Sequence, residues 1–207
     1  MSIDQTTRRP GLTAALLIAL TAAAPAATNA APAVVPGAPS GRVARFLGPR
    51  AAAILARASR VEIFRVQDKR AGEGDKSVGG YVIAAAGTEQ ADLSARRLAD
   101  LLLDEKSYRF DHSTVGRFVP LVGLRLWDGE RSVDVLVSFA TDEVVVFSRN
   151  PDDGSVRSAQ ADAAPARGAL VALAKQALPD DRAVRALQSS AVSDSSTRSP
   201  STGTVPR

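Results

Sequence analysis

The chain has 207 residues, of which 45% are hydrophobic and 23% charged, and its formal net charge is +4. This composition is typical of one globular domain with flanking segments and excludes a chain that is disordered throughout. The sequence contains no cysteine, which excludes disulfides, zinc thiolate centres, thiol catalysis and acylation of a lipoprotein cysteine. Basic and acidic residues are interspersed, so the concentrated basic face of a nucleic-acid-binding protein is not expected.

Residues 1–30 have the three-part pattern of a secretory signal peptide. Arg8 and Arg9 form a positive start, an apolar core runs from residue 12 to residue 24, and small residues surround a predicted cleavage site near Ala30. The core is shorter than the roughly 20 residues that a membrane helix needs. An uncleaved anchor or a buried helix is the alternative. We expect a mature protein without a transmembrane segment, in the periplasm or secreted.

Composition divides the rest of the chain into three parts. Residues 31–42 are a Pro/Ala-rich linker, residues 43–188 are predicted to form a single α+β domain, and residues 189–207 are a Ser/Thr-rich tail predicted to be disordered. A short helix is expected at residues 50–58, opening near Pro49. Several arginines lie in and around this helix, and no acidic residue occurs between residues 42 and 60. This basic stretch indicates either a solvated helix face or a contact with a membrane surface or acidic partner.

Two strands are predicted next, at residues 61–66 and 81–86. The glycine-rich charged segment between them lacks both common phosphate-loop patterns, so we interpret it as a long hairpin connection. A helix is predicted from about residue 89 to residue 103 with Thr88 as its N-cap, because alanines and leucines recur at helical spacing. We assign this apolar stripe to the core and not to a binding site.

The strongest pattern is an antiparallel meander with strands at residues 121–127, 132–140 and 143–148. Asp128-Gly129 is a typical two-residue hairpin turn, which would place residues whose numbers sum to about 257 opposite each other. A weaker turn at Thr141-Asp142 would add Val144 and Val146 to the apolar face. That face is assigned to the core and carries Val122, Leu124, Leu126, Val133, Val135, Val137 and Phe139.

The opposite face of the meander mixes apolar and charged side chains. Trp127, Arg125, Asp134 and Phe147 lie there, whereas a solvated sheet face normally has a clean polar pattern. Part of this face is therefore covered, by the N-terminal helix, by another element of the chain or by a partner. Asp134 and Arg125, expected to lie diagonally, form either a cross-strand ion pair or the polar groups of a binding groove.

The sequence carries no recognisable catalytic or metal-binding motif. His112 is the single histidine and has polar neighbours, so we interpret it as a surface residue and not as a general base. Paired carboxylates such as Asp152-Asp153 are typical of turns, and the residues after this pair do not continue a calcium loop. No cofactor is predicted, and the expected ligand is an unknown protein or small molecule of the cell envelope.

Three short motifs resemble a group of small exported bacterial α/β proteins of unknown function. They are Ser107-Tyr108-Arg109-Phe110 after a helix, Phe118-Val119-Pro120, and Asp134-Val135-Leu136-Val137-Ser138-Phe139 in a strand. The resemblance covers roughly residues 61–178 and implies one exported α/β domain, with no activity or catalytic residue to transfer. Members often carry Cys near the positions of Gly116 and Ala140, and this chain lacks any thiol there.

Together these elements predict an α+β domain with a mainly antiparallel sheet of about five strands, helices on one face and the order α-β-β-α-β-β-β-α. Its last long helix opens near Pro165 and ends before Pro179. The predicted function is a non-enzymatic binding or interaction domain, exported to the envelope or secreted. The alternative is a hydrolase or transferase without a recognisable motif, which a pocket uniting His112 with acids of the meander would favour.

Overall fold

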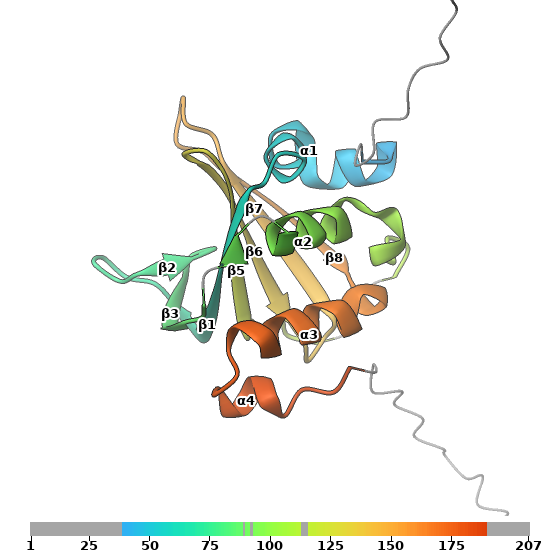
Figure 1. Cartoon of the computed structure of the whole chain (residues 1–207). Helices are drawn as coiled ribbons and strands as arrows, with labels where there is room; N and C mark the ends of the chain where they lie inside the picture. The colour runs from blue at the N-terminus through green and yellow to red at the C-terminus, as the bar shows by residue number, and fades with distance from the viewer. Residues whose placement is uncertain (1–38, 89, 92, 113–115, 190–207) are drawn as a thin grey trace, which may run out of the picture. The chain divides into compact units, whose positions relative to one another are not determined.

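The computed structural model describes residues 39–88, 90–91, 93–112 and 116–189 (Figure 1). The predicted signal peptide lies outside these residues, as do most of the predicted linker and tail. Helices and strands follow the order α1 (Gly41–Leu55), β1 (Arg60–Arg70), β2 (Ser77–Val78), β3 (Tyr81–Ala86), β4 (Gln90–Ala91), α2 (Leu93–Leu103), β5 (Val122–Asp128), β6 (Arg131–Ser138), β7 (Glu143–Arg149), β8 (Val156–Asp162), α3 (Arg167–Ala177) and α4 (Arg182–Arg185), with 3-10 turns at Glu105–Ser107 and Ala164–Ala166.

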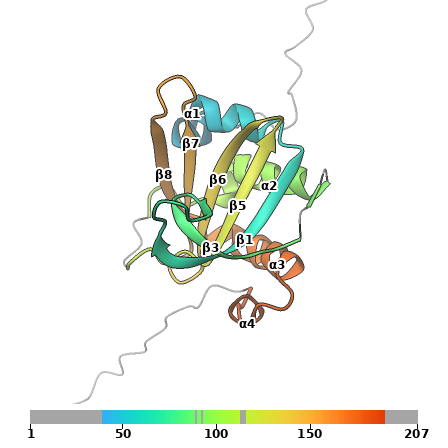
Figure 2. The same ribbon diagram turned by 90° about the vertical axis from the view of Figure 1, so that its left-hand side faces the viewer.

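The strands form one antiparallel sheet in the spatial order β2-β3-β1-β5-β6-β7-β8, and β4 pairs with β1 beside this path. Helices α1, α2 and α3 cover one face, and the β2–β3 hairpin lies on the other side (Figures 1 and 2). The α+β class and the antiparallel sheet are confirmed. The predicted strand number and element order are incomplete, because β2, β4 and β8 were not predicted.

The main core lies between the helices and the sheet. Every residue that the alternation assigned to the core face of the meander is at most 8% exposed and belongs to this cluster. Leu98 and Leu102 of α2 and Leu170 of α3 pack onto the same cluster. Period-2 alternation in the strands and period-3.6 spacing in the helices therefore identified the buried faces correctly.

The register of the β5–β6 hairpin differs from the predicted one. Leu124 lies opposite Val135, so paired residue numbers sum to 259 and not to 257. The central turn residues are Gly129 and Glu130. Only Gly129 of the two has positive φ (60°), which is the pattern of a type II′ turn and not of type I′. A register shift of two residues keeps each side chain on the same face of the sheet, so the residues assigned to the core are still correct.

The turn between β6 and β7 is longer than predicted. Ser138 pairs with Glu143, so the connection has four residues, and its last residue, Asp142, has a φ of 54°. Val144 and Val146 lie in the main core, as predicted. An aspartate tolerates this left-handed conformation better than most residues because its short side chain bonds locally.

Helix α1 is longer than predicted and has a break. It begins at Gly41, within the last two residues of the predicted linker, and its second half, from Pro49 to Leu55, corresponds to the predicted helix. Gly48 has φ 78° and ψ 160°, a conformation open essentially to glycine alone, and it separates the two halves. Pro49 then opens the second half, where its missing N–H has no helical partner to lose.

Helix α2 begins later than predicted. Gln90 and Ala91 pair with β1 as strand β4, and the helix starts at Leu93, so Thr88 is not its N-cap. Two acids within the predicted helix, Glu89 and Asp92, lie outside the described residues. The backbone partner offered by β1 overrides the local capping pattern. By contrast, Asp181 is a local cap of α4, because its side chain accepts a hydrogen bond from Val184 N.

Strand β8 occupies a segment for which the sequence predicts no strand. It pairs with β7 over its whole length. Its sequence, VRSAQAD, has little β-branched character, and only Ala161 and Asp162 are buried. An edge strand with one neighbour needs few large apolar residues, so the period-2 pattern is weak there. No helix in the part of the chain that the structure describes combines the length and hydropathy needed to cross a membrane.

Candidate functional site

The sequence-predicted site begins with Arg125 and Asp134, which lie directly opposite each other on β5 and β6 and not diagonally. Arg125 Nε donates to Asp134 Oδ1 at 2.6 Å, and Arg125 Nη2 donates to Asp134 Oδ2 at 2.9 Å. The two side chains are 25% and 18% exposed. The hydrogen bond to Asp134 raises the pKa of Arg125 against the opposing effect of burial. This bidentate pair is stronger than an exposed cross-strand pair.

The same ion pair holds the β2–β3 hairpin against the sheet. Gly79 N, in the turn between β2 and β3, donates to Asp134 Oδ2 at 2.9 Å, and Arg125 Nη2 donates to Ser77 O at 3.0 Å. Gly79 has a φ of 56°, and a Cβ atom there would lie 2.8 Å from Leu136 Cγ. The hairpin therefore approaches the sheet so closely that only glycine fits at this point.

A small second core lies under this hairpin. Val66, Val78 and Leu136 are fully buried in it, and Phe147 packs against it half-buried. Val66 points to this side by ordinary alternation, because Phe64, two positions earlier on β1, packs against the same cluster. The element that covers part of the second sheet face is thus another part of the same chain, one of the three possibilities left open by the sequence.

Trp127 occupies the margin of the covered area. Its Nε1 donates to Glu62 Oε2 at 2.7 Å, and the guanidinium of Arg60 lies 4.7 Å from the ring centroid. The ring is half-buried and held from two sides. Arg125 is also within 5.9 Å of the ring, so Trp127 and the ion pair are neighbours. Phe147 is held in the small core, and the four residues share one face without enclosing a described pocket.

The polar groups of this face are satisfied within the protein. Asp134 accepts from Arg125 and Gly79, and Arg125 donates to Asp134 and Ser77. Such a network anchors a hairpin and leaves little hydrogen-bonding capacity for a ligand. Binding of a partner at the half-buried Trp127 and Phe147 stays a prediction.

His112 is exposed and does not line the groove between α2 and α3 that is described below. Its backbone N–H donates to Arg109 O in a turn. Among the described residues, no group of three or more histidines and acids is placed to hold a metal ion. None of the described pockets unites His112 with acids of the meander, so the hydrolase or transferase alternative stays a prediction.

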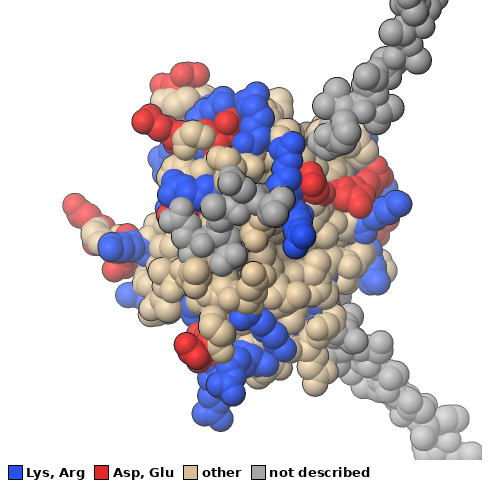
Figure 3. Space-filling view, in the orientation of Figure 1, with Lys and Arg blue, Asp and Glu red and all other residues tan. Residues whose placement is uncertain are grey.

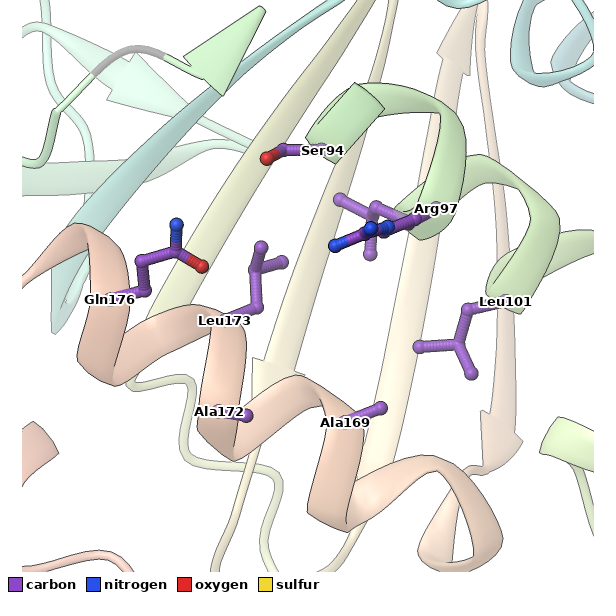
Figure 4. A pocket seen from close by; sticks show the side chains of 8 residues that line it. Ser94, Arg97, Leu101, Ala169, Ala172, Leu173 and Gln176 are labelled. Atoms are coloured by element: carbon purple, nitrogen blue, oxygen red, sulfur yellow. The ribbon is translucent and has the colours of Figure 1, made fainter. Parts of the chain in front are cut away.

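A groove between α2 and α3 is the feature that sequence reasoning missed (Figure 4). It holds about 300 Å³ and is lined by Ser94, Arg97, Leu98, Leu101, Ala169, Ala172, Leu173 and Gln176. Arg97 and Leu101 reach from α2, and Leu173 and Gln176 from α3, toward the space between the helices (Figure 4). Figure 3 shows mainly uncharged atoms over this part of the surface.

The side chains that line the groove are mainly apolar, and one of them, Arg97, is positively charged. Leu98 is buried in its floor, while Leu101 and Leu173 are half-buried, so part of the stripe assigned to the core also faces the groove. No acid lines the groove. The sequence signal was present, since α2 carries more apolar residues than a narrow core stripe needs, but the facing residues of α3 come from a segment about 70 positions later.

No protein-family model, curated protein or solved structure matches this chain.

Proposed function

We propose that this chain is an exported, non-enzymatic binding protein, and that the groove between α2 and α3 takes an amphipathic small molecule with an apolar chain and an acidic head. The observation that carries the proposal is the lining: leucines and alanines along the groove, one arginine, and no acid. Its volume of about 300 Å³ lies at the lower end of the range for ligand sites, about 300–1,000 Å³.

The apolar part of the ligand would supply most of the affinity. Each methylene removed from water contributes about 0.8 kcal/mol, so a short alkyl chain over Leu98, Leu101 and Leu173 gives measurable binding. Arg97 is exposed and would pair with the acidic head at the rim. An exposed ion pair contributes only about 0.2–1 kcal/mol, so the cation sets the preference for an acid and not the bulk of the affinity.

The test is a titration of the purified full-length chain with decanoate and, in parallel, with decanol, followed in methyl-resolved NMR spectra. We expect saturable shifts of the Leu101 and Leu173 methyl signals, with decanoate binding about threefold to fivefold more tightly than decanol. Ala172 is exposed in the groove, so Ala172→Phe should fill the space without disturbing the core and abolish binding of both compounds.

Two control variants separate the groove from general surface effects. Ala183→Phe adds the same ring on exposed α4 and should leave binding unchanged. Arg97→Gln should remove the preference for the acid, whereas Arg185→Gln, which removes an exposed arginine of α4, should retain it. Shifts confined to other leucines, or equal binding by the Ala172→Phe variant, would contradict the proposal.

Export rests on the N-terminal pattern and needs its own experiment. We expect the protein recovered from the periplasm or medium of a bacterial host to begin at or near Ala31, as determined by mass spectrometry of its N-terminal peptide. Replacing Leu16 and Leu17 by arginine breaks the apolar core of the leader and should leave the unprocessed chain inside the cell. Efficient processing of that variant would contradict the proposed route.

A further inference from the structure

A second, polar groove lies at the opposite part of the helical layer, between the second half of α1 and the ends of β7 and β8 (Figure 1). It holds about 360 Å³, and its lining includes Gly48, Arg50, Ser148, Asn150, Ser155 and Arg157. Figure 3 shows basic and acidic side chains side by side over this end of the molecule. We call this feature the Arg50 groove. It is separate from the groove between α2 and α3.

Arg50 is the first unusual feature of the Arg50 groove. Its side chain is partly buried, and its Nε atom is buried without a hydrogen-bond acceptor among the described residues. A buried polar atom normally has a partner, and a desolvated cation without a counter-charge is costly. Nε itself is closed to solvent, so an anion in the groove would bind the rest of the guanidinium and supply the missing counter-charge.

Arg157 brings a second guanidinium to the same groove and is held in place by α1. Its Nη2 donates to Arg45 O at 2.9 Å and to Phe46 O at 3.4 Å, just before the break at Gly48. The residue four positions after Arg45 is Pro49, which has no N–H to donate to Arg45 O. Gly48 makes this approach possible, because a Cβ atom there would lie only 3.0 Å from Arg157 Nε. The remaining donors of Arg157 are not used by these two bonds.

The other polar groups of the groove fit an oxyanion and include no acid. Ser148 is only 6% exposed and lines the groove with Asn150 and Ser155. The neighbouring acid Asp153 belongs to the hairpin tip, where it accepts from Ser155 N at 2.8 Å. Bonding to the Ser155 side chain and backbone lowers the pKa of Asp153, so this carboxylate serves the turn and not the groove.

We propose that the Arg50 groove binds a phosphate-type oxyanion between the guanidinium groups of Arg50 and Arg157. Two guanidinium groups present planar sets of donors that match the oxygens of phosphate. The oxyanion is either a free anion or the headgroup of an anionic phospholipid, which share this chemistry. The site does not depend on the ligand of the groove between α2 and α3.

The test uses the full-length chain and inorganic phosphate, with chloride added to keep the ionic strength constant. We expect saturable shifts of the arginine Nε–H NMR signals of Arg50 and Arg157. Arg50→Gln should weaken phosphate binding about tenfold or more, the effect of losing a charge-assisted hydrogen bond. Arg157→Gln should also weaken phosphate binding. If the Arg157→Gln variant does not fold, the Arg50→Gln variant by itself tests the proposal.

The matched control is Arg45→Gln, because Arg45 is exposed on α1 and does not line the groove. It removes the same charge and should leave phosphate binding unchanged. Absence of saturable shifts at Arg50 and Arg157, or equal weakening by Arg45→Gln, would overturn the proposal.

A second arm distinguishes the two sources of the anion. Co-sedimentation with phosphatidylglycerol vesicles, but not with phosphatidylcholine vesicles, that is lost in the Arg50→Gln variant supports a lipid headgroup. Phosphate binding without co-sedimentation supports a free anion.

Discussion

Single polar side chains join the layers of this protein, and three of them are held in bonds that burial strengthens. Arg167 is 6% exposed, donates to Phe139 O at 2.8 Å and to Gln188 O at 3.0 Å, and pairs with Asp142. Tyr108 is buried, and its hydroxyl donates to Leu102 O at 2.7 Å. Arg125 joins β5, β6 and the hairpin. Each removes a polar group from water and satisfies it within the protein, so loss of a partner costs more than the bond itself.

Tyr108 makes the free energy of unfolding depend on pH in the alkaline range. Burial raises the pKa of its phenol in the folded state, so the folded protein holds this proton more tightly than the unfolded chain. The contribution is complete below the unfolded pKa, about 10, and declines as the pH rises above that value. We expect the free energy of unfolding from urea titrations to decrease between about pH 10 and pH 11.5. The Tyr108→Phe variant should lose this part of the decrease, and equal slopes for both proteins would contradict the assignment.

The Arg125–Asp134 pair should contribute more than a surface ion pair. Asp134→Asn keeps the shape of the side chain but removes its charge, leaving a half-buried guanidinium without its counter-ion. We expect the free energy of unfolding to fall by about 1–3 kcal/mol. A double-mutant cycle with Arg125→Gln, measured by urea unfolding, should show coupling of at least about 1 kcal/mol. Additive effects would mean that the pair does not hold the hairpin.

At the scale of elements, glycines decide where one segment approaches another. Gly48 divides α1, and Gly79 and Gly123 bring the β2–β3 hairpin onto the sheet. At Gly123, an added Cβ atom would lie 2.4 Å from Val78 Cγ1, far inside van der Waals contact. The small core under the hairpin therefore exists because two of its contact points lack side chains.

Gly123→Ala should lift the hairpin from the sheet. The methyl group collides with Val78, so we expect the free energy of unfolding to fall by about 1–3 kcal/mol, the usual cost of overpacking. Amide hydrogen exchange should accelerate at Gly79, whose N–H bonds Asp134. Gly72→Ala is the control: the nearest atom to its added Cβ is Asp75 Oδ2 at 3.7 Å, and its effect should stay within about 0.5 kcal/mol. Unchanged exchange at Gly79 would show that the hairpin is not held at Gly123.

At the scale of the whole molecule, one sheet separates two unequal layers. Helices cover one face completely enough to form the main core, and a short hairpin covers part of the other. The two proposed ligand sites both lie in or beside the helical layer, one between α2 and α3 and one beside α1. The sheet thus serves as a scaffold: one groove lies between two helices, and the other lies between α1 and the ends of β7 and β8.

The Ser/Thr-rich C-terminal segment should add nothing to the stability of this unit. It has too little apolar surface to offset the entropy of ordering. A chain ending at residue 189 should therefore melt within about 2 °C of the full chain, since surface changes of this kind usually alter stability by less than 0.5 kcal/mol. Limited proteolysis should trim the full chain to about the same end. A markedly lower melting temperature for the truncated chain would contradict the predicted disorder.

The sequence by itself determined which residues of the meander face the main core and roughly where α2 and α3 lie. These properties follow from local periodicity, and a register error of two residues at the Asp128-Gly129 turn did not alter them because side chains alternate with period 2. Capping at Asp181 and the helix stop at Pro179 are likewise local. The start of α2 is not set by local sequence, because β1, a distant strand, provides backbone hydrogen-bond partners for Gln90 and Ala91.

Only the tertiary structure decided which segment covers the second sheet face and which arginines meet. Asp134 and Gly79 are 55 positions apart, and Arg157 reaches the carbonyl of Arg45 across 112 positions. Local patterns carry no information about such pairings, since they depend on how the whole chain packs. The sequence showed that the second face needed a cover and that Arg50 belonged to a basic stretch, and the fold supplied the hairpin and the second arginine.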